Sequence, residues 1–522
     1  METTTTMIEE ALVPLPNPQS YISLSSSAES LRATSINDLP YDLLSEILCY
    51  ARRTSNNRST PHHPSASRSC PTEVGAVCTY WRETVWSTPR LWTSFTIDNK
   101  FWKTANRTAV LRLYFQNAGN HALDITFTSL PRDYTSRRST GGRRIPGEDV
   151  FDTIFTHNPN RLGSLTFTQY PVSWFPYISE ISKSPYFSNL QSLNVRDLRF
   201  GTANISQTIT LHLVPRLTTL SLHGTTNTIF IFPPDVWSHI LHLKLSSIPS
   251  TAALQLALNC ATHLETLTLT LLDLTELDDD SSLSQHYSTH LPNEPITFPN
   301  LKSFSFGEPE SDIPPQCWDS SLGRGLLLFP SLTHLTFTPC DPLLFDYYRD
   351  FMRDHIPTTL THLTLRCTHS QEFVGALHEA IPRLGALESL QLVFVFMRVS
   401  VDVINLLRVG NEGEEPVSVP LPNLFELGVE ATEDDDFLFG LGGATGKKGA
   451  ALAAILEVAR ERLRLGRTSV MLRRLGLGFG RPICAEGSFS RWPDYVKEDL
   501  KELIGEGLEV EIGCYQSSFT GL

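Results

Sequence analysis

The segments "LTHLTF" (332–337) and "LTHLTL" (360–365) are two copies of a pattern that decides the fold of this 522-residue chain. The pattern is Leu-x-x-Leu-x-Leu, in which Phe, Ile or Val replaces some of the leucines. Its eleven copies begin at residues 162, 190, 217, 240, 264, 301, 332, 360, 387, 424 and 472. Six of the ten intervals between these starts are 23 to 28 residues long, and the others are 31 to 48. Such a period indicates a repeat architecture, with insertions where the interval is longer.

The last four residues of each copy alternate between polar and apolar side chains, as in a β-strand with one buried face. One such strand cannot bury its leucines alone, whereas stacked copies can. Segments between the copies fit helices, and "ALAAILEVARERL" (451–463) places its apolar residues on one stripe. We therefore predict an α/β fold in which helices cover a parallel sheet over residues 151–522.

The repeats resemble those of irregular leucine-rich repeat proteins, of the ribonuclease-inhibitor-like or F-box-associated kind. The resemblance covers residues from about 160 to about 515, although the Asn that often follows the repeat core in that family is mostly missing. It implies a horseshoe-shaped solenoid with the parallel sheet on its concave face.

The polar residues of the repeats are expected to point away from the core, on the concave side. They are rich in hydroxyls and poor in charge, except toward the C-terminal end, where Arg473, Arg474 and Arg481 gather. Ser and Thr are also ordinary choices for an exposed strand, so composition alone does not establish a binding face. Because solenoids generally bind through this surface, we predict a protein substrate site at Thr219, His242, Lys244, Thr266, Ser303, His334, Thr336, His362, Thr364, Gln391 and Arg474.

A separate apolar segment, "LPYDLLSEILCYARR" (39–53), stands near the N-terminus beside the polar run "TSNNRSTPHHPSASRS". Its apolar residues recur at helical spacing, with Pro40 in the first turn. Residues 71–97 carry another helical stripe, which includes Trp81. So small a helical unit has a thin core and cannot hide all of these side chains. We expect the excess apolar surface to contact a partner, to cap the first repeat, or to do both.

The stretch "INDLPYDLLSEILCYARR…VGAVCTYWRETVWSTPRLW" resembles the F-box in its Leu-Pro start, its Leu-Leu-x-x-Ile-Leu helix and its later Val-Cys-x-x-Trp-Arg. The F-box docks on the Skp adaptor, which attaches it to a cullin–RING ubiquitin ligase. The trailing "PRLW" before a strand-like "TSFTI" looks like F-box proteins of filamentous and mushroom-forming fungi. By matching position, the resemblance implies that the adaptor contacts Leu39, Pro40, Leu43, Leu44, Ile47, Leu48, Val77, Cys78 and Trp81.

These features divide the chain into four parts. Residues 1–35 are expected to be disordered, and residues 36–95 to form the F-box module, with the polar run at about 54–70 as an insertion. Residues 96–150 are expected to connect or cap, with a basic loop at 132–148, and residues 151–522 to form the repeats.

Composition excludes several classes of protein. A net charge of −14 and a pI of about 5.6 argue against nucleic acid as the main partner. No apolar run is long enough to span a bilayer, and the acidic N-terminus does not read as a secretory signal, so we expect a cytoplasmic or nuclear protein. The nine cysteines include no Cys-x-x-Cys pair, which argues against zinc modules and a disulfide framework.

Patterns for catalysis or cofactors are weak. The glycine-rich "GLGGATGKKGA" (440–450) fails the phosphate-loop spacing, and the acidic runs at 276–280 and 433–437 lack calcium-loop spacing. His334 and His362 precede the central leucine of successive repeats, where they could form a metal or pH-sensitive pair, but no carboxylate or cysteine recurs with them. We therefore expect neither a cofactor nor a metal.

The predicted function is non-catalytic substrate recognition in a Skp–cullin–F-box ubiquitin ligase. The F-box would hold the Skp adaptor, and the repeats would hold a protein substrate whose identity the sequence does not give. One alternative is a leucine-rich-repeat interaction scaffold without a ligase role. Another, from a different class, is a nucleotide-binding enzyme that uses the loop at 440–450.

Overall fold

The structure is a computed structural model, which describes residues 36–57, 71–129, 147–168, 174–183, 187–196, 207–212, 214–223, 228–246, 248, 250–270, 294–307, 325–338, 349–367, 371–394, 401–408, 419–431, 450–465, 472–479 and 494–514. Several predictions fall outside these residues: the disordered segment at 1–35, most of the polar run and of the basic loop, the acidic runs, and the glycine-rich loop at 440–449. No helix in the described ranges is long and apolar enough to cross a membrane.

The described residues form one large, open parallel sheet of fourteen strands, joined in chain order. From one edge to the other these strands are β1 (Ser94–Ile97), β2 (Leu123–Phe127), β3 (Leu162–Phe167), β4 (Ser192–Val195), β6 (Thr219–His223), β8 (His242–Ser246), β9 (Thr266–Thr270), β11 (Ser303–Gly307), β13 (His334–Thr338), β14 (His362–Cys367), β15 (Ser389–Phe394), β16 (Glu426–Ala431), β17 (Arg474–Phe479) and β18 (Glu509–Cys514). Two small parallel sheets pair β5 (Gln207–Thr210) with β7 (Thr228–Ile231), and β10 (Ile296–Thr297) with β12 (Leu327–Leu328).

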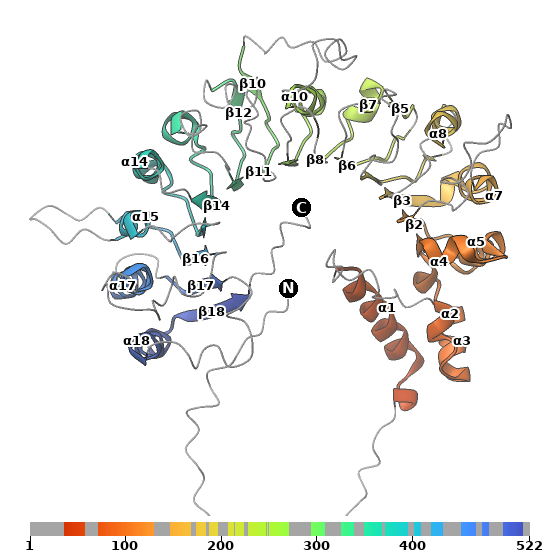
Figure 1. The fold of residues 1–522 in the computed structure, drawn as a ribbon, viewed down its shortest axis with the longest axis horizontal. Helices are drawn as coiled ribbons and strands as arrows, with labels where there is room; N and C mark the ends of the chain where they lie inside the picture. The colour runs from red at the N-terminus through yellow and green to blue at the C-terminus, as the bar shows by residue number, and fades with distance from the viewer. Residues whose placement is uncertain are drawn as a thin grey trace, which may run out of the picture.

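Helices lie on the outer side of an arc whose inner side is lined by the strands (Figure 1). Those between strands include α4 (Asn99–Lys103), α5 (Arg107–Asn117), α7 (Glu148–Phe151), α8 (Trp174–Ser182), α9 (Pro234–Trp237), α10 (Ser250–Asn259), α14 (Gln371–Ala380), α15 (Val401–Asn405), α17 (Ala450–Leu465) and α18 (Asp494–Gly505). At the start of the arc stand α1 (Tyr41–Asn57), α2 (Pro71–Val74), α3 (Thr79–Ser87) and the 3-10 turn η3 (Pro89–Trp92). The predicted α/β class with a large parallel sheet is confirmed, and the open stack is consistent with a repeat solenoid.

Each of the eleven repeat copies supplies one strand of the large sheet. The first apolar residue of every copy is at most 1% exposed, which explains why the pattern starts two residues before most of the strands. These residues are Leu162, Leu190, Leu217, Ile240, Leu264, Leu301, Leu332, Leu360, Leu387, Leu424 and Leu472. The sheet also contains β1, β2 and β18, which the repeat pattern did not predict.

Backbone and side-chain hydrogen bonds keep successive repeats in register. The carbonyl oxygen of Lys302 accepts from the amides of both Thr333 and His334 at 2.9 Å, and the carbonyl of Thr333 does the same for the next repeat. Just before the first leucine of a repeat, Asn300 and Asn423 donate their side-chain amides to carbonyls of the preceding turn at 2.8 Å. These bonds satisfy turn carbonyls that would otherwise be left without a protein donor.

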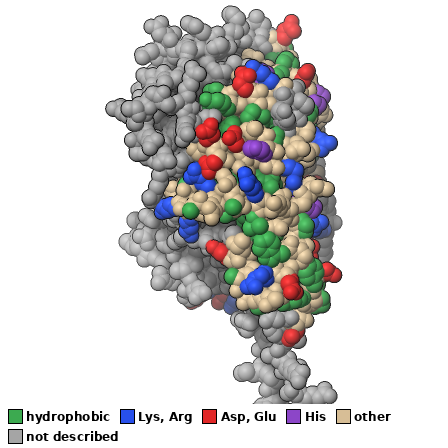
Figure 2. Space-filling view, turned by 90° about the vertical axis from the view of Figure 1, so that its right-hand side faces the viewer, with side chains coloured by type: hydrophobic (Ala, Val, Ile, Leu, Met, Phe, Trp, Pro, Cys, Tyr) green, Lys and Arg blue, Asp and Glu red, His purple; other side chains and the backbone are tan. Residues whose placement is uncertain are grey.

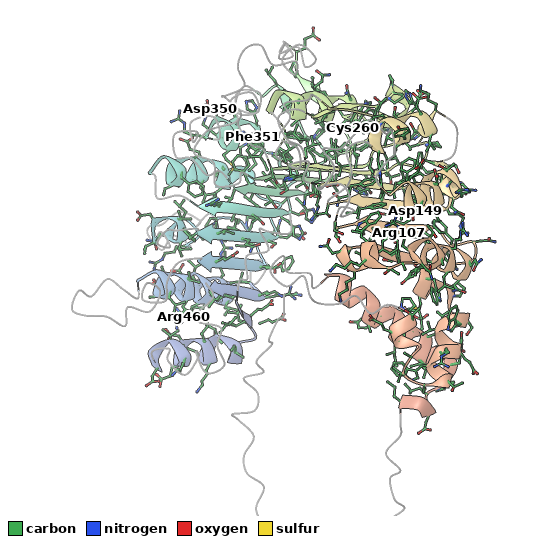
Figure 3. The ribbon with its side chains drawn as sticks, turned by 45° about the vertical axis from the view of Figure 1, so that its right-hand side comes forward. Arg107, Asp149, Cys260, Asp350, Phe351 and Arg460 are labelled. Carbon is green, nitrogen blue, oxygen red and sulfur yellow. The ribbon has the colours of Figure 1, made fainter. Side chains whose placement is uncertain are left out.

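The N-terminal helices share one continuous hydrophobic core with the sheet. Trp92 in η3 is fully buried, and its ring lies 5.0 Å from that of Trp86 on α3 and 5.2 Å from that of Tyr114 on α5. Nearby, Arg107 on α5 donates two hydrogen bonds to Asp149 on α7, at 2.7 and 2.8 Å (Figure 3). The helical end is therefore packed directly against the sheet domain, in addition to being connected to it by the chain.

The first helix is longer than its sequence pattern indicates, because α1 ends at Asn57 and not at Arg53. No proline or glycine stands between these two residues, so nothing local breaks the helix there.

The strand assignment can be tested with two neighbouring substitutions in β14. Leu363→Ala is expected to lower the free energy of unfolding by about 2–5 kcal/mol, because a buried leucine leaves a cavity. Thr364→Ala, on the opposite face, should change it by less than about 0.5 kcal/mol. Urea unfolding followed by circular dichroism measures both, and equal losses would contradict the assignment of faces.

Candidate functional site

The eleven predicted concave-face residues lie in two straight rows across the sheet. In β4 to β18 the first row is Ser192, Thr219, His242, Thr266, Ser303, His334, His362, Ser389, Glu426, Arg474 and Glu509. The second row is Asn194, Ser221, Lys244, Thr268, Ser305, Thr336, Thr364, Gln391, Gly428, Gly476 and Glu511. Residues far apart in sequence thus form one continuous polar surface.

Two histidines lie side by side in the middle of the first row. The rings of His334 and His362 are stacked, with centroids 4.2 Å apart and planes inclined by 10°. Nδ1 of each ring lies 2.9 Å from the hydroxyl of the preceding threonine, Thr333 or Thr361. Burial, followed by the neighbouring His362, lowers the pKa of His334, which favours its neutral form. Among the described residues no group of three His, Cys, Asp or Glu could hold a metal ion.

The C-terminal end of the concave face differs from the expected basic cluster. Arg474 lies 3.7 Å from Glu426 and 3.3 Å from Glu509, so two carboxylates neutralise its charge. Glu511 adds a further acid in the second row. Arg481 lies outside the described residues, and the strands β16 to β18 present more acids than bases. The expectation was wrong because β18, which carries two of these acids, was not predicted as a strand.

Glu430, on β16, is a functional candidate that the sequence did not reveal. It is only 2% exposed, and its Oε1 has no hydrogen-bond partner, while its Oε2 accepts from Nε2 of Gln391 at 3.3 Å. Burial raises the pKa of Glu430 to about 7. It was missed because it lies just after the last residue of the repeat pattern, where alternation continues on the same face.

Exposed apolar side chains gather at the helical end. Of the nine exposed large hydrophobic residues in the described part of the chain, seven belong to residues 36–86: Ile36, Tyr41, Leu43, Ile47, Tyr50, Val77 and Trp86. Leu43, Ile47 and Tyr50 follow helical spacing and form a stripe on α1 that points to solvent, with exposed fractions of 55%, 44% and 69%. Figure 2, which views the molecule from this side, shows hydrophobic side chains gathered toward the lower part of the face.

The predicted adaptor contacts divide into three groups by exposure. Pro40, Leu43, Ile47 and Val77 are exposed, and Leu39, Leu48, Cys78 and Trp81 are partly exposed. Leu44 requires a correction, because it is fully buried. It packs inside the helical end and has no surface to offer a partner.

Hydrogen bonds fix the exposed stripe relative to α3. The hydroxyl of Tyr41 lies 2.6 Å from the hydroxyl of Ser87, and the hydroxyl of Tyr80 donates to the carbonyl of Leu39 at 2.7 Å. Cys78 caps the start of α3, where its sulfur accepts from the amide of Trp81 at 3.5 Å. Leu39, Cys78 and Trp81 therefore shape the helical end as well as border its surface.

A comparison with models of known protein families finds no match, and a search of curated proteins finds no relative. The candidate sites therefore depend on the geometry of the two surfaces, the concave rows and the apolar stripe.

Glu430 predicts a pH dependence of stability. The folded-state pKa of Glu430 lies above the value of 4.5 expected for an unfolded glutamate, because the buried carboxyl group favours its protonated form. The stability that this protonated group contributes is fully present below pH 4.5 and is lost as pH rises through about 7. Between about pH 5 and about pH 8 this group should lower the free energy of unfolding by on the order of 1–3 kcal/mol.

Glu430→Gln is expected to remove this loss and to stabilise the protein above pH 7. The exposed Glu506→Gln, near the end of α18, is the control and should leave the pH profile unchanged. Urea unfolding across this pH range measures the profile, and a profile of Glu430→Gln that matches the wild type would contradict the assignment.

Proposed function

We propose that this chain is the substrate-recognition subunit of a Skp–cullin–F-box ubiquitin ligase. The F-box resemblance of residues 36–95 and the leucine-rich-repeat resemblance of the later residues support the proposal. The observation that carries it is the exposed stripe of Leu43, Ile47 and Tyr50 on α1, in a helical end that also exposes Val77. Exposed apolar residues concentrated in one small helical module are typical of a surface that a partner covers.

Energetics favours a partner at this stripe. Burial of a leucine or isoleucine side chain contributes about 1.5–3 kcal/mol, so two such residues could supply a substantial share of the free energy of a protein complex. Tyr50 and Trp86 add aromatic side chains of the type enriched at the centres of interfaces. Leu44 of the same helix is fully buried, which anchors α1 to the helical end.

The link between the two surfaces supports a role in positioning. The hydroxyl of Tyr41 on α1 lies 2.6 Å from that of Ser87 on α3. Trp86, also on α3, is 42% exposed, and its ring lies 5.0 Å from that of the fully buried Trp92. Trp92 in turn contacts Tyr114, on the helix that follows β1 and α4. A partner on the stripe would therefore be held at a fixed place relative to the concave face. In a ligase, such an arrangement acts by proximity, because it holds a substrate lysine near the ubiquitin carrier.

An interaction scaffold without a ligase role would use the same two surfaces, so adaptor binding is the property that separates the two functions. The enzyme alternative depends on the glycine-rich loop, whose residues 440–449 lie outside the described part of the chain, and no observation on the described residues favours it. Burial raises the pKa of the Cys260 thiol to about 12, which makes it a poor nucleophile.

Adaptor binding can be tested by copurification of the full chain with a Skp adaptor. The double variant Leu43→Glu and Ile47→Glu should lose the adaptor, because two charges replace apolar contacts at the centre of the stripe. Both positions are exposed, so folding should be retained, as circular dichroism would show.

Leu328→Glu provides the matched control, since Leu328 is 41% exposed but lies in β12, far from the helical end in the sequence. It should copurify as well as the wild type. Failure of the wild-type chain to bind any Skp adaptor would rule out the ligase function and leave the scaffold.

A further inference from the structure

We propose that the concave surface of β4, β6 and β8 binds an acidic segment of the partner protein, whose carboxylates contact Lys244 and Arg196. This inference rests on the proposed role of the concave face in holding a partner. It adds the chemical class of the segment that is recognised and its place in the sheet.

Lys244 and Arg196 are two cations for which the described part of the chain supplies no counter-ion. Lys244 is half-buried in the second row on β8, and Arg196 directly follows β4. Neither side chain makes an ion pair or a hydrogen bond to any residue of the structure that is described. Lys244 is in register with Ser221 and, through it, with Asn194, and Arg196 follows Asn194 by two residues, so the two cations come from strands about 10 Å apart on the same face. Burial and then the charge of Arg196 lower the pKa of Lys244. An anion placed between them would remove this repulsion.

Among the described residues, the concave face around the two cations carries no acid. On the strands from β3 to β15 none of the residues that face the concave side is Asp or Glu. The first acids on either side are Asp124 on β2 and Glu426 on β16. Glu265 precedes β9 but is engaged by Lys302, whose Nζ lies 3.1 Å from its Oε1. The whole chain has a net charge of −14, so a face that carries cations and no acid differs in sign from the protein as a whole.

Hydroxyl and imidazole groups complete the donor set. Ser221 on β6 stands between Asn194 and Lys244 in the second row, and Thr219 stands beside His242 in the first. Hydroxyls donate to carboxylates, and the planar guanidinium of arginine can form a bidentate pair with one. An extended segment that crosses the strands could thus place successive acidic side chains over β4, β6 and β8.

The other end of the same face argues against a polyanion such as RNA. Glu426 on β16, together with Glu509 and Glu511 on β18, would repel a phosphate backbone that extended along the rows. A protein segment can carry acids at one end only, so it fits a face that is basic in one part and acidic in another.

The test measures fluorescence anisotropy of a labelled glutamate-rich peptide with the full chain. Binding should weaken as salt is raised, and Lys244→Met should weaken it by about tenfold, because a charged contact is lost. Lys302→Met is the matched control: it removes one lysine that pairs with Glu265 outside the rows, and it should bind as the wild type does. Arg196→Gln provides a second variant at an exposed position, with the same expected loss.

Three outcomes would overturn the proposal. These are no binding of the glutamate peptide by the wild type, equal losses in Lys244→Met and Lys302→Met, and binding of a phosphoserine peptide while the glutamate peptide stays unbound. Because the measurement uses the isolated chain, a failure of adaptor copurification would leave its result unaffected. A failure here would equally leave the adaptor result standing.

Discussion

Burial of the apolar side of each strand by its two neighbours is the constraint on which the rest of the structure depends. Leu335 on β13 lies in register between Phe304 on β11 and Leu363 on β14, and each is 1% exposed. Without its neighbours, a strand of this length would leave its leucines in water, at a cost of about 1.5–3 kcal/mol for each side chain. Stability therefore accumulates from contacts between adjacent repeats, and register cannot slip without exposing the whole apolar set.

The same constraint orders the opposite face. Because the apolar residues must align, the polar residues between them align as well, so rows of side chains form whether or not neighbours in a row interact. The stacked His334 and His362 are one result, and Lys244 and Arg196, which have no ion-pair partner among the described residues, are another. A substitution in a row changes the binding surface while the leucines beneath stay buried. Such a face can vary in chemistry while the fold is retained.

Sequence periodicity predicted eleven strands, because the leucines that repeat are those that the sheet must bury. It did not include β1, which was noted only as the strand-like "TSFTI", and it missed β2 and β18, whose segments "LDITF" and "EVEIGC" alternate correctly but have no complete Leu-x-x-Leu spacing. The missed β18 also explains the wrong expectation for Arg474, whose partner Glu509 could not be foreseen. Helical spacing placed Leu43 and Leu44 on one stripe, but which of them faces the core depends on where α3 and η3 pack. The burial of Glu430 likewise depends on tertiary surroundings that no local pattern encodes.

Irregular spacing of the repeats does not disturb the geometry between the two candidate surfaces. The interval between the copies that form β16 and β17 is 48 residues, yet Glu426 and Arg474 are register partners in adjacent strands. Their neighbouring helices are also joined, since Arg460 on α17 donates to Asp499 on α18 at 2.8 Å (Figure 3). The pairing of adjacent strands is thus independent of the length of the interval that joins them. The distance from the helical end to any position on the concave face is set by the number of strands between them, each about 4.8 Å from the next. A chain built in this way can lengthen or change its loops while the position of a bound partner relative to α1 is preserved.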